Sequence, residues 1–298
     1  EHYGLKLKKD VVAELILDKT SVDMIVGDKT KIDYTINPST ATNKKINWAT
    51  SNSKIATVDS NGNITAVGAG TATITATADG NDKVSSKIEV TVVDPYVTIQ
   101  NGEKASMIEG SKMQLFTDTG VLDSKVTFKS SDENILKVDS NGLVTGVKEG
   151  TAKITATIEK YKKTATIEIT VNKLSEDETI KIENYKETNG VISNFARETK
   201  TTEFAKHIKV TGNLKVKVDT ENFVGSGTIV EVYRGDKCIQ TYICKLYGDV
   251  NGDGKISAVD YMYLMNKIMD VKEITGDIEK DVADINSDKK ISAVDYMY

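Results

Sequence analysis

The chain has 298 residues, of which 39 % are hydrophobic, 6 % aromatic and 28 % charged, and its formal net charge is −5. This balance excludes the strongly basic composition of proteins that bind nucleic acids or anionic membranes. The sequence has no apolar run of about eighteen residues, so we predict no membrane span. Residues 249–298 hold 11 acidic and 6 basic side chains, which leaves 33 of each for the preceding residues. The acidic surplus therefore lies at the C-terminal end.

The only cysteines, Cys238 and Cys244, fall in one predicted strand. Side chains six residues apart on a strand lie about 20 Å apart, too far for a disulfide. The missing disulfide framework alone would favour a cytosolic protein, although low cysteine use is also ordinary for surface proteins of anaerobes. The chain begins at Glu1 and shows no signal peptide, so we interpret it as an excerpt from a longer protein.

Residues 1–10 read as a short basic tail, and from Val11 the sequence is rich in β-formers with turn signals every eight to twelve residues. This spacing is typical of a β-sandwich. Residues 46–77 recur as residues 126–157 at an offset of 80. The chain therefore contains two copies of one domain.

Turns and strands can be assigned inside each copy. Asn61-Gly62 and Asn141-Gly142 predict type I′ hairpin turns, in which both central residues have positive φ. Strict alternation of small apolar residues predicts one strand in each copy with a single buried face. The inward residues are Ala72, Ile74 and Ala76 in the first copy and Ala152, Ile154 and Ala156 in the second.

Trp48 and Phe128 occupy matching positions inside strand-like runs. We interpret them as core residues rather than a sugar-stacking platform. The segments LDKTSVDMIVGDKTKIDYTI and NWATSNSKIATVDSNGNITAVGAGTATITAT, with their counterparts, resemble the bacterial immunoglobulin-like group 2 family. The resemblance implies two sandwich domains that act as spacers on surface proteins, and some members of the family bind host or glycan ligands.

The second copy is the more divergent, because Gly110 lies 83 residues after Gly27 rather than 80. Pro95 marks the joint, whose shortness predicts stiff stacking of the two sandwiches. Residues 173–178 (KLSEDE) are a predicted polar linker. The following module, which ends near residue 247, resembles a small β-rich unit found before dockerins in Firmicute proteins.

Residues 201–208 (TTEFAKHI) predict a short helix capped by Thr201 or Thr202, with Phe204 and Ile208 on one face. His207 is interpreted as structural or solvated, because the sequence offers no partner for a metal site or a catalytic triad. A tripeptide Arg-Gly-Asp at 234–236 matches the motif that integrins recognise. Hairpin turns favour Gly-Asp for backbone reasons, so we interpret it as a structural turn.

Residues 249–260 carry oxygen ligands at positions 1, 3, 5, 9 and 12, a backbone carbonyl at position 7 and glycine at position 6. This order is that of a twelve-residue calcium loop. The ligands are Asp249, Asn251, Asp253, Lys255 through its carbonyl, Ser257 and Asp260. An acidic surface turn is the alternative, but it does not require the full pattern.

The pattern recurs thirty-five residues later, from residue 284 to residue 295. The second set of ligands is Asp284, Asn286, Asp288, Lys290 through its carbonyl, Ser292 and Asp295. Position 6 of this loop is Lys289, which must adopt a left-handed backbone at a cost of about 1–2 kcal/mol. We therefore predict two Ca²⁺ sites, of which the second is weaker.

Each loop ends in aspartate at position 12, and the same Ala-Val pair stands directly before that aspartate. The paired loops resemble a type I dockerin. The resemblance implies a secreted or cell-surface protein that docks onto the cohesin domain of a scaffold, as in cellulosomes. Carried over by position, the cohesin contacts would be Ala258, Val259, Met265, Asn266, Ala293 and Val294. The chain ends three residues after the second loop, so we expect an incomplete last helix and weaker partner binding.

The predicted fold is mostly β: two tandem immunoglobulin-like β-sandwiches, a small α+β module and a truncated, α-helical, EF-hand-like dockerin. The predicted segments are a tail (1–10), the two sandwiches (11–94 and 95–172), the module (173–247) and the dockerin (248–298). The favoured function is non-catalytic docking in polysaccharide degradation. The alternatives are an adhesin whose repeats bind a glycan or protein, and the accessory end of a glycoside hydrolase whose catalytic domain lies upstream of Glu1. No pair of carboxylates stands out as acid and base within this chain.

Overall fold

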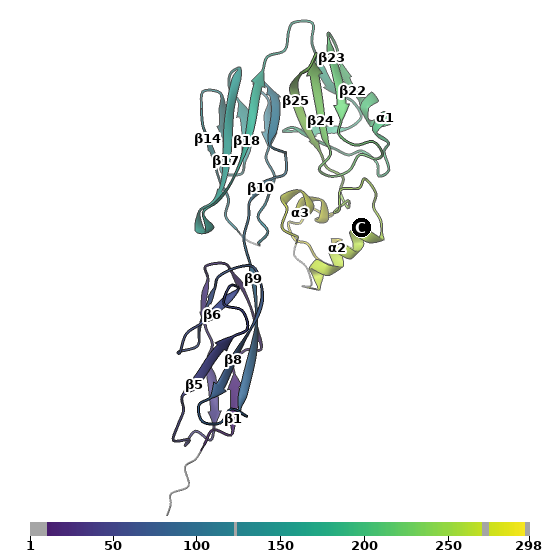
Figure 1. Cartoon of the computed structure of the whole chain (residues 1–298). Coiled ribbons are helices and arrows are strands. Elements are labelled where there is room, and N and C mark those ends of the chain that lie inside the picture. Colours follow the sequence, from purple (N-terminus) through teal and green to yellow (C-terminus); the bar gives the residue numbers. More distant parts are fainter. Residues whose placement is uncertain (1–10, 122–123, 270–273, 296–298) are drawn as a thin grey trace, which may run out of the picture. The chain divides into compact units, whose positions relative to one another are not determined.

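A computed structural model (Figure 1) describes residues 11–121, 124–269 and 274–295. The chain divides into two compact units, Glu1–Pro95 and Tyr96–Tyr298. The structure is mostly β, as predicted.

The first unit is a β-sandwich. Its strands are β1 (Glu14–Leu17), β2 (Ser21–Ile25), β3 (Lys29–Lys31), β4 (Tyr34–Asn37), β5 (Ile46–Thr50), β6 (Ala56–Val58), β7 (Asn63–Ala66), β8 (Gly70–Ala78) and β9 (Ser85–Val93). The larger sheet has the order β2-β9-β8-β5, with β2 and β9 parallel, and it faces the sheet β3-β7-β6; β1 pairs with β4. Ala72, Ile74 and Ala76 are 2 %, 0 % and 0 % exposed, so the predicted inward face of β8 is confirmed.

The hairpin turns are not type I′. Gly62 has a φ of 79°, whereas Asn61 is not among the residues with positive φ. The Asp59 side chain explains the difference, because its Oδ1 accepts hydrogen bonds from the amides of Asn61 (2.8 Å) and Asn63 (2.9 Å). The Gly62 amide closes the turn by donating to the Asp59 carbonyl at 3.2 Å. An aspartate two residues before the Asn-Gly pair therefore selects a longer turn.

The two aromatic residues lie over these turns. A Cβ on Gly62 would come within 2.8 Å of the Trp48 ring, and one on Gly142 within 2.9 Å of Phe128. Both rings are half-buried at the margin of their cores. They are packing residues, as predicted, and the ring contact explains why the turn position is glycine in both copies.

The second unit begins with a sandwich of the same topology. Its strands are β10 (Thr98–Ile99), β11 (Lys104–Ile108), β12 (Lys112–Gln114), β13 (Thr117–Asp118), β14 (Thr127–Ser130), β15 (Leu136–Val138), β16 (Leu143–Gly146), β17 (Gly150–Ile158) and β18 (Lys163–Asn172), with a 3₁₀ turn η1 (Glu159–Tyr161). The sheets are β11-β18-β17-β14, β12-β16-β15 and β10-β13. Each matches a sheet of the first sandwich, as the internal repeat predicts.

The module that follows is built on a five-stranded sheet of order β20-β21-β25-β24-β23, beside the pair β19-β22. Its elements are β19 (Ile180–Ile182), β20 (Lys186–Thr188), β21 (Val191–Ser193), α1 (Thr201–Phe204), η2 (Ala205–His207), β22 (Ile208–Val210), β23 (Leu214–Val218), β24 (Ile229–Arg234) and β25 (Lys237–Cys244). Cys238 and Cys244 both lie in β25 and are free thiols, as predicted.

The predicted helix is shorter than 201–208, because α1 gives way to the 3₁₀ turn η2 and Ile208 already begins β22; the predicted cap does not form either. Lys200 is the N-cap residue and makes no side-chain cap, while the Thr201 hydroxyl donates to the carbonyl of Thr220 at 3.0 Å. Phe204 and Ile208 are both buried in the module core, as predicted. The Thr201 amide donates to the Asn222 carbonyl at 3.0 Å, so this first helical amide has a partner without a side-chain cap.

The module is joined to the second sandwich by buried polar contacts between β11 and β25. The Ser106 amide donates to Thr241 Oγ1 and its hydroxyl donates to the Cys238 carbonyl, both at 2.9 Å. The Ile108 amide donates to Gln240 Oε1 at 2.9 Å. These side chains satisfy backbone groups at a strand edge that would otherwise be buried without partners.

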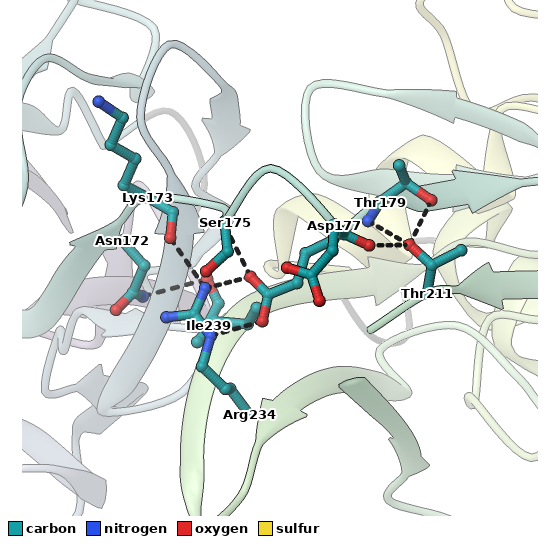
Figure 2. Close-up of polar contacts among 9 residues, drawn as sticks. Asn172, Lys173, Ser175, Asp177, Thr179, Thr211, Arg234 and Ile239 are labelled. Atoms are coloured by element: carbon teal, nitrogen blue, oxygen red, sulfur yellow. Dashed lines mark hydrogen bonds and ion pairs between the residues drawn. The ribbon is translucent and has the colours of Figure 1, made fainter. Parts of the chain in front are cut away.

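The predicted linker is fixed at the same junction (Figure 2). Glu178 is buried and accepts from Arg234 Nε at 2.7 Å and from its Nη2, which also donates to the Lys173 carbonyl at 2.9 Å. This guanidinium holds the pKa of Glu178 at about 2. Asn172 Nδ2 donates to the Ile239 carbonyl at 3.1 Å. The Arg-Gly-Asp turn is therefore a structural one, because its half-buried arginine is held by Glu178 and by the Lys173 carbonyl.

Two helices complete the described chain, α2 (Ala258–Ile268) and α3 (Asp277–Ala283). Phe116 of the second sandwich is 8 % exposed and belongs to one core cluster with Ile278 and Val282 of α3. Val191 and Ile243 of the module join the same cluster. The core under α3 is therefore shared by all three parts of the second unit.

Polar contacts also attach α3 to the second sandwich. Asp277 Oδ2 accepts from the Thr117 amide at 2.8 Å and its hydroxyl at 2.7 Å. Gln100 Nε2 donates to Glu279 at 2.6 Å, and its Oε1 accepts from the Ile278 amide at 3.1 Å. The Gln100 bond satisfies an amide of the first turn of α3, where backbone amides lack intrahelical partners, and the other bonds are made by side chains of that turn.

Candidate calcium loops and docking face

The first loop is closed by the start of α2. Ser257 is the N-cap residue, and its hydroxyl accepts from the Val259 amide at 3.2 Å. Asp260 makes the reciprocal hydrogen bond of this cap, since its Oδ2 accepts from the Ser257 amide at 2.9 Å. Its Oδ1 accepts from the amides of Val250 (3.0 Å) and Asn251 (3.2 Å). Asp260, buried at 2 % exposure, thus ties the two ends of the loop together.

Asp249, at position 1, is fully buried. Its Oδ2 accepts from the amides of Ser226 (2.8 Å) and Gly254 (3.1 Å), whereas its Oδ1 is buried without a hydrogen-bond partner. Burial raises the pKa of this carboxyl. A buried carboxylate oxygen with no partner is costly unless a cation or a proton meets it.

The donor set suits a hard cation. Asn251 and Asp253 share the loop with Asp249, and the amides of Asp253 and Lys255 each donate at 2.9 Å to the acceptor two residues earlier. Across the described ranges no group of three or more His, Cys, Asp or Glu side chains is poised around one point. The site offers amide, hydroxyl and backbone carbonyl oxygens beside its carboxylates, which is the chemistry of Ca²⁺ rather than of zinc.

The second loop repeats this path with more strain. Lys289 has a φ of 67°, as predicted, and Ser287 a φ of 61°. The equivalent residues of the first loop are Gly252 and Gly254, with φ of 77° and 76°. Ser287 was missed by the sequence analysis, although its alignment with Gly252 is the signal that reveals it. Two non-glycine residues in the left-handed region strain the backbone of this loop.

The predicted ligands of the second loop make hydrogen bonds of the same kind. Asp284 accepts from the amides of Asp288 (3.0 Å) and Lys289 (2.8 Å). Asp295 is buried and accepts from the amides of Asn286 (3.3 Å) and Ser292 (2.9 Å). Unlike Asp249, Asp284 is only half-buried, and its hydrogen bonds come from its own loop.

The residues assigned to partner contact differ in exposure. Ala258, Val259, Ala293 and Val294 are exposed, whereas Met265 and Asn266 are half-buried. The helix that should follow the second loop falls on Tyr296–Tyr298, outside the described residues.

Further exposed apolar side chains lie on α2 and at Met269, the residue directly after it. Met262, Tyr263 and Met269 are 60 %, 38 % and 64 % exposed, beside Val259 at 48 %. The i, i+3 and i+4 spacing from Val259 could have revealed Met262 and Tyr263. We call Val259, Met262 and Tyr263 the docking face; the opposite side of α2 is anchored by buried Leu264.

Comparison with known families agrees with this architecture. Residues 11–88 match the bacterial Ig-like domain (group 2) family, and residues 124–173 match a bacterial Ig-like domain family. These segments are immunoglobulin-like domains of bacterial type. Residues 247–298 match the dockerin type I domain family, so the C-terminal part of the chain is a type I dockerin, a calcium-binding domain. All of these families are non-catalytic.

Three curated relatives match parts of the chain. An uncharacterized protein of Clostridium acetobutylicum is 32 % identical over 35 % of this chain and 11 % of its own length. Two proteins of Bifidobacterium longum are an alpha-L-arabinofuranosidase, 40 % identical over 24 % of this chain and 7 % of its length, and a 3-O-alpha-D-galactosyl-alpha-L-arabinofuranosidase, 39 % identical over 33 % and 9 %. The chain thus spans about a tenth of the relatives it matches.

Solved structures resemble the chain only distantly. The S-layer protein rSbsC(31-844) has a TM-score of 0.32 at 15 % identity, covering 80 % of this chain and 41 % of that one. A C-terminal fragment of intimin, in complex with its receptor's binding domain, has a TM-score of 0.29 at 22 % identity, covering 58 % and 66 %. No helix in the described ranges has the length and hydropathy needed to cross a bilayer.

Proposed function

We propose that this chain is the non-catalytic docking end of a secreted bacterial protein, and that its dockerin binds a cohesin domain on a scaffold. The observation that carries the proposal is the exposed docking face of α2, directly after the first calcium loop. Three large apolar side chains on one helix face are the kind of surface that a protein partner covers.

Calcium acts on this face through the loop. Asp260 is both a loop residue and the capping partner of Ser257, so the loop and the first turn of α2 share one carboxylate. An ion held by Asp249, Asn251 and Asp253 would offset the repulsion among the loop carboxylates and fix the start of α2. Metal binding and folding of the dockerin are therefore coupled, and chelation should release the partner.

The immunoglobulin-like domains are proposed to be spacers, and the module between residues 173 and 247 to be the support of the dockerin. A second candidate concerns the larger protein. Two relatives are named as arabinofuranosidases, which favours a parent glycoside hydrolase of which this chain is the accessory end. In that case the docking role remains the same, and the polysaccharide substrate belongs to another domain.

The test is capture of proteins from the source culture with this chain as bait, in calcium and in chelator. We expect a cohesin-bearing scaffold, identified by mass spectrometry, only in calcium. Val259→Asp should abolish that capture, because it places a charge on the docking face. Val67→Asp is the matched control, since Val67 is similarly exposed at 46 % but lies in the first sandwich. Capture of a glycan or another protein, indifferent to chelator and to Val259→Asp, would refute the docking role.

A further inference from the structure

We propose that residues 223–226 of the module, here called the covering turn, form part of the first calcium site by positioning Asp249. This inference rests on the proposed calcium role of the first loop. It extends the site beyond the dockerin, since a turn of the preceding module supplies the group that orients a metal ligand.

The covering turn and the loop meet through glycines. A Cβ on Gly225 would lie 2.5 Å from the Gly252 carbonyl oxygen, 2.5 Å from the Gly254 amide nitrogen and 2.6 Å from Asp249 Oδ2. Gly225 is not among the glycines with positive φ. Its position therefore excludes a side chain because of the close contact with the loop, and not because of its own backbone conformation. The closeness is mutual, because a Cβ on Gly254 would lie 2.7 Å from Phe223 Cβ.

The covering turn is also held in place from behind. The Ser226 hydroxyl bonds both the carbonyl and the amide of Leu246 at 3.1 Å, just before the loop begins. On the other side of the loop, the Glu198 amide donates to the Gly254 carbonyl at 2.7 Å. The backbone segment that carries the Ser226 amide is therefore held in position beside Asp249.

The Ser226 amide decides which oxygen of Asp249 is left for the ion. Oδ2 is occupied by the amides of Ser226 and Gly254, while Oδ1 is buried with no partner. A cation is the group that such an oxygen requires. In the second loop both oxygens of Asp284 accept from amides of the loop itself, and that carboxylate is half-buried. The two sites therefore differ in a feature that lies outside the loops.

The experiment is calorimetric titration of the full chain with CaCl₂, in a background where Asp284→Ala and Asp288→Ala silence the second loop. Ser226→Pro removes the amide donor, and Ser226→Ala is its matched control because it loses the same hydroxyl but keeps the amide. We expect Ser226→Pro to weaken calcium binding roughly tenfold or more relative to Ser226→Ala, the typical loss for a hydrogen bond to a charged group. Gly225→Ala should weaken it as well, by pushing the covering turn off the loop.

A second measurement needs no variant. Hydrogen exchange of the unaltered chain should show that calcium protects amides of residues 223–228 together with those of the first loop. Equal affinities in Ser226→Pro and Ser226→Ala, or protection confined to the loop, would overturn the inference. Failure of the background chain to bind calcium would instead refute the proposed function of the loop, so the two failures are distinguishable.

Discussion

Replacing Phe116 by alanine tests whether the dockerin core depends on the second immunoglobulin-like domain. Phe116 is 8 % exposed and lies in one cluster with Ile278 and Val282 of α3. Removing a buried phenylalanine side chain typically costs about 3–5 kcal/mol. For a unit of the size of Tyr96–Tyr298, each kcal/mol lowers the melting temperature by roughly 2–4 °C. We therefore expect the transition of the second unit to fall by about 6–20 °C.

The assay is differential scanning calorimetry of the full chain in calcium, together with hydrogen exchange of α3. The control is Asp33→Ala, because Asp33 occupies the matching position in the first sandwich and is exposed. That variant should leave both the second transition and α3 unchanged. A loss below about 1 kcal/mol in Phe116→Ala, with unchanged exchange in α3, would refute the shared core.

Two further outcomes follow from local geometry. Lys289→Gly should stabilise the calcium-loaded dockerin by about 1 kcal/mol in urea unfolding, because glycine accepts a left-handed backbone. The control is Lys290→Gly, at a residue without positive φ, which should bring no such gain. Equal effects of the two substitutions would contradict the strain argument. Arg234 lowers the pKa of Glu178 from 4.5 to about 2. The contribution of the ionised Glu178 to the free energy of unfolding is therefore complete above pH 4.5 and is lost as the pH falls through about 2. The difference in unfolding free energy between the unaltered chain and Glu178→Gln should shrink over this window, and a difference independent of pH would contradict it.

The core that the second sandwich, the module and α3 share could not be predicted from the sequence. Apolar alternation and the internal repeat predicted both sandwiches, because a strand with one buried face leaves a period of two in the sequence. No periodicity records which surface of a finished domain meets another domain. Comparison of the two copies does carry a signal. The core residues Ile32 and Leu115 occupy matching positions in the first and second copy. The next residue is the exposed Asp33 in the first copy and Phe116 in the second. A surface position that is apolar in only one copy indicates a contact made by that copy alone.

The candidate calcium loops are the part of the site that the sequence describes most fully. A ligand sequence with fixed offsets is local, so Asp249 through Asp260 could be recognised without any knowledge of the fold. The covering turn was not predictable, because Ser226 contributes a backbone amide and Gly225 contributes the lack of a side chain. Neither residue type indicates metal binding, and both lie more than twenty residues before the ligand that they position. Such contributions become visible only when the chain is folded.

The arrangement of the second unit also bears on how a bound scaffold would be held. If the dockerin were tethered by a flexible linker, binding would fix only its own position and leave the remaining domains free. Here the linker residue Glu178 is buried against Arg234, and Asp277 joins α3 to the second sandwich. The orientation of the docking face is therefore set by the same contacts that stabilise the unit. Calcium loss at the first loop should loosen the module as well as the dockerin, because Asp249 is bonded to both.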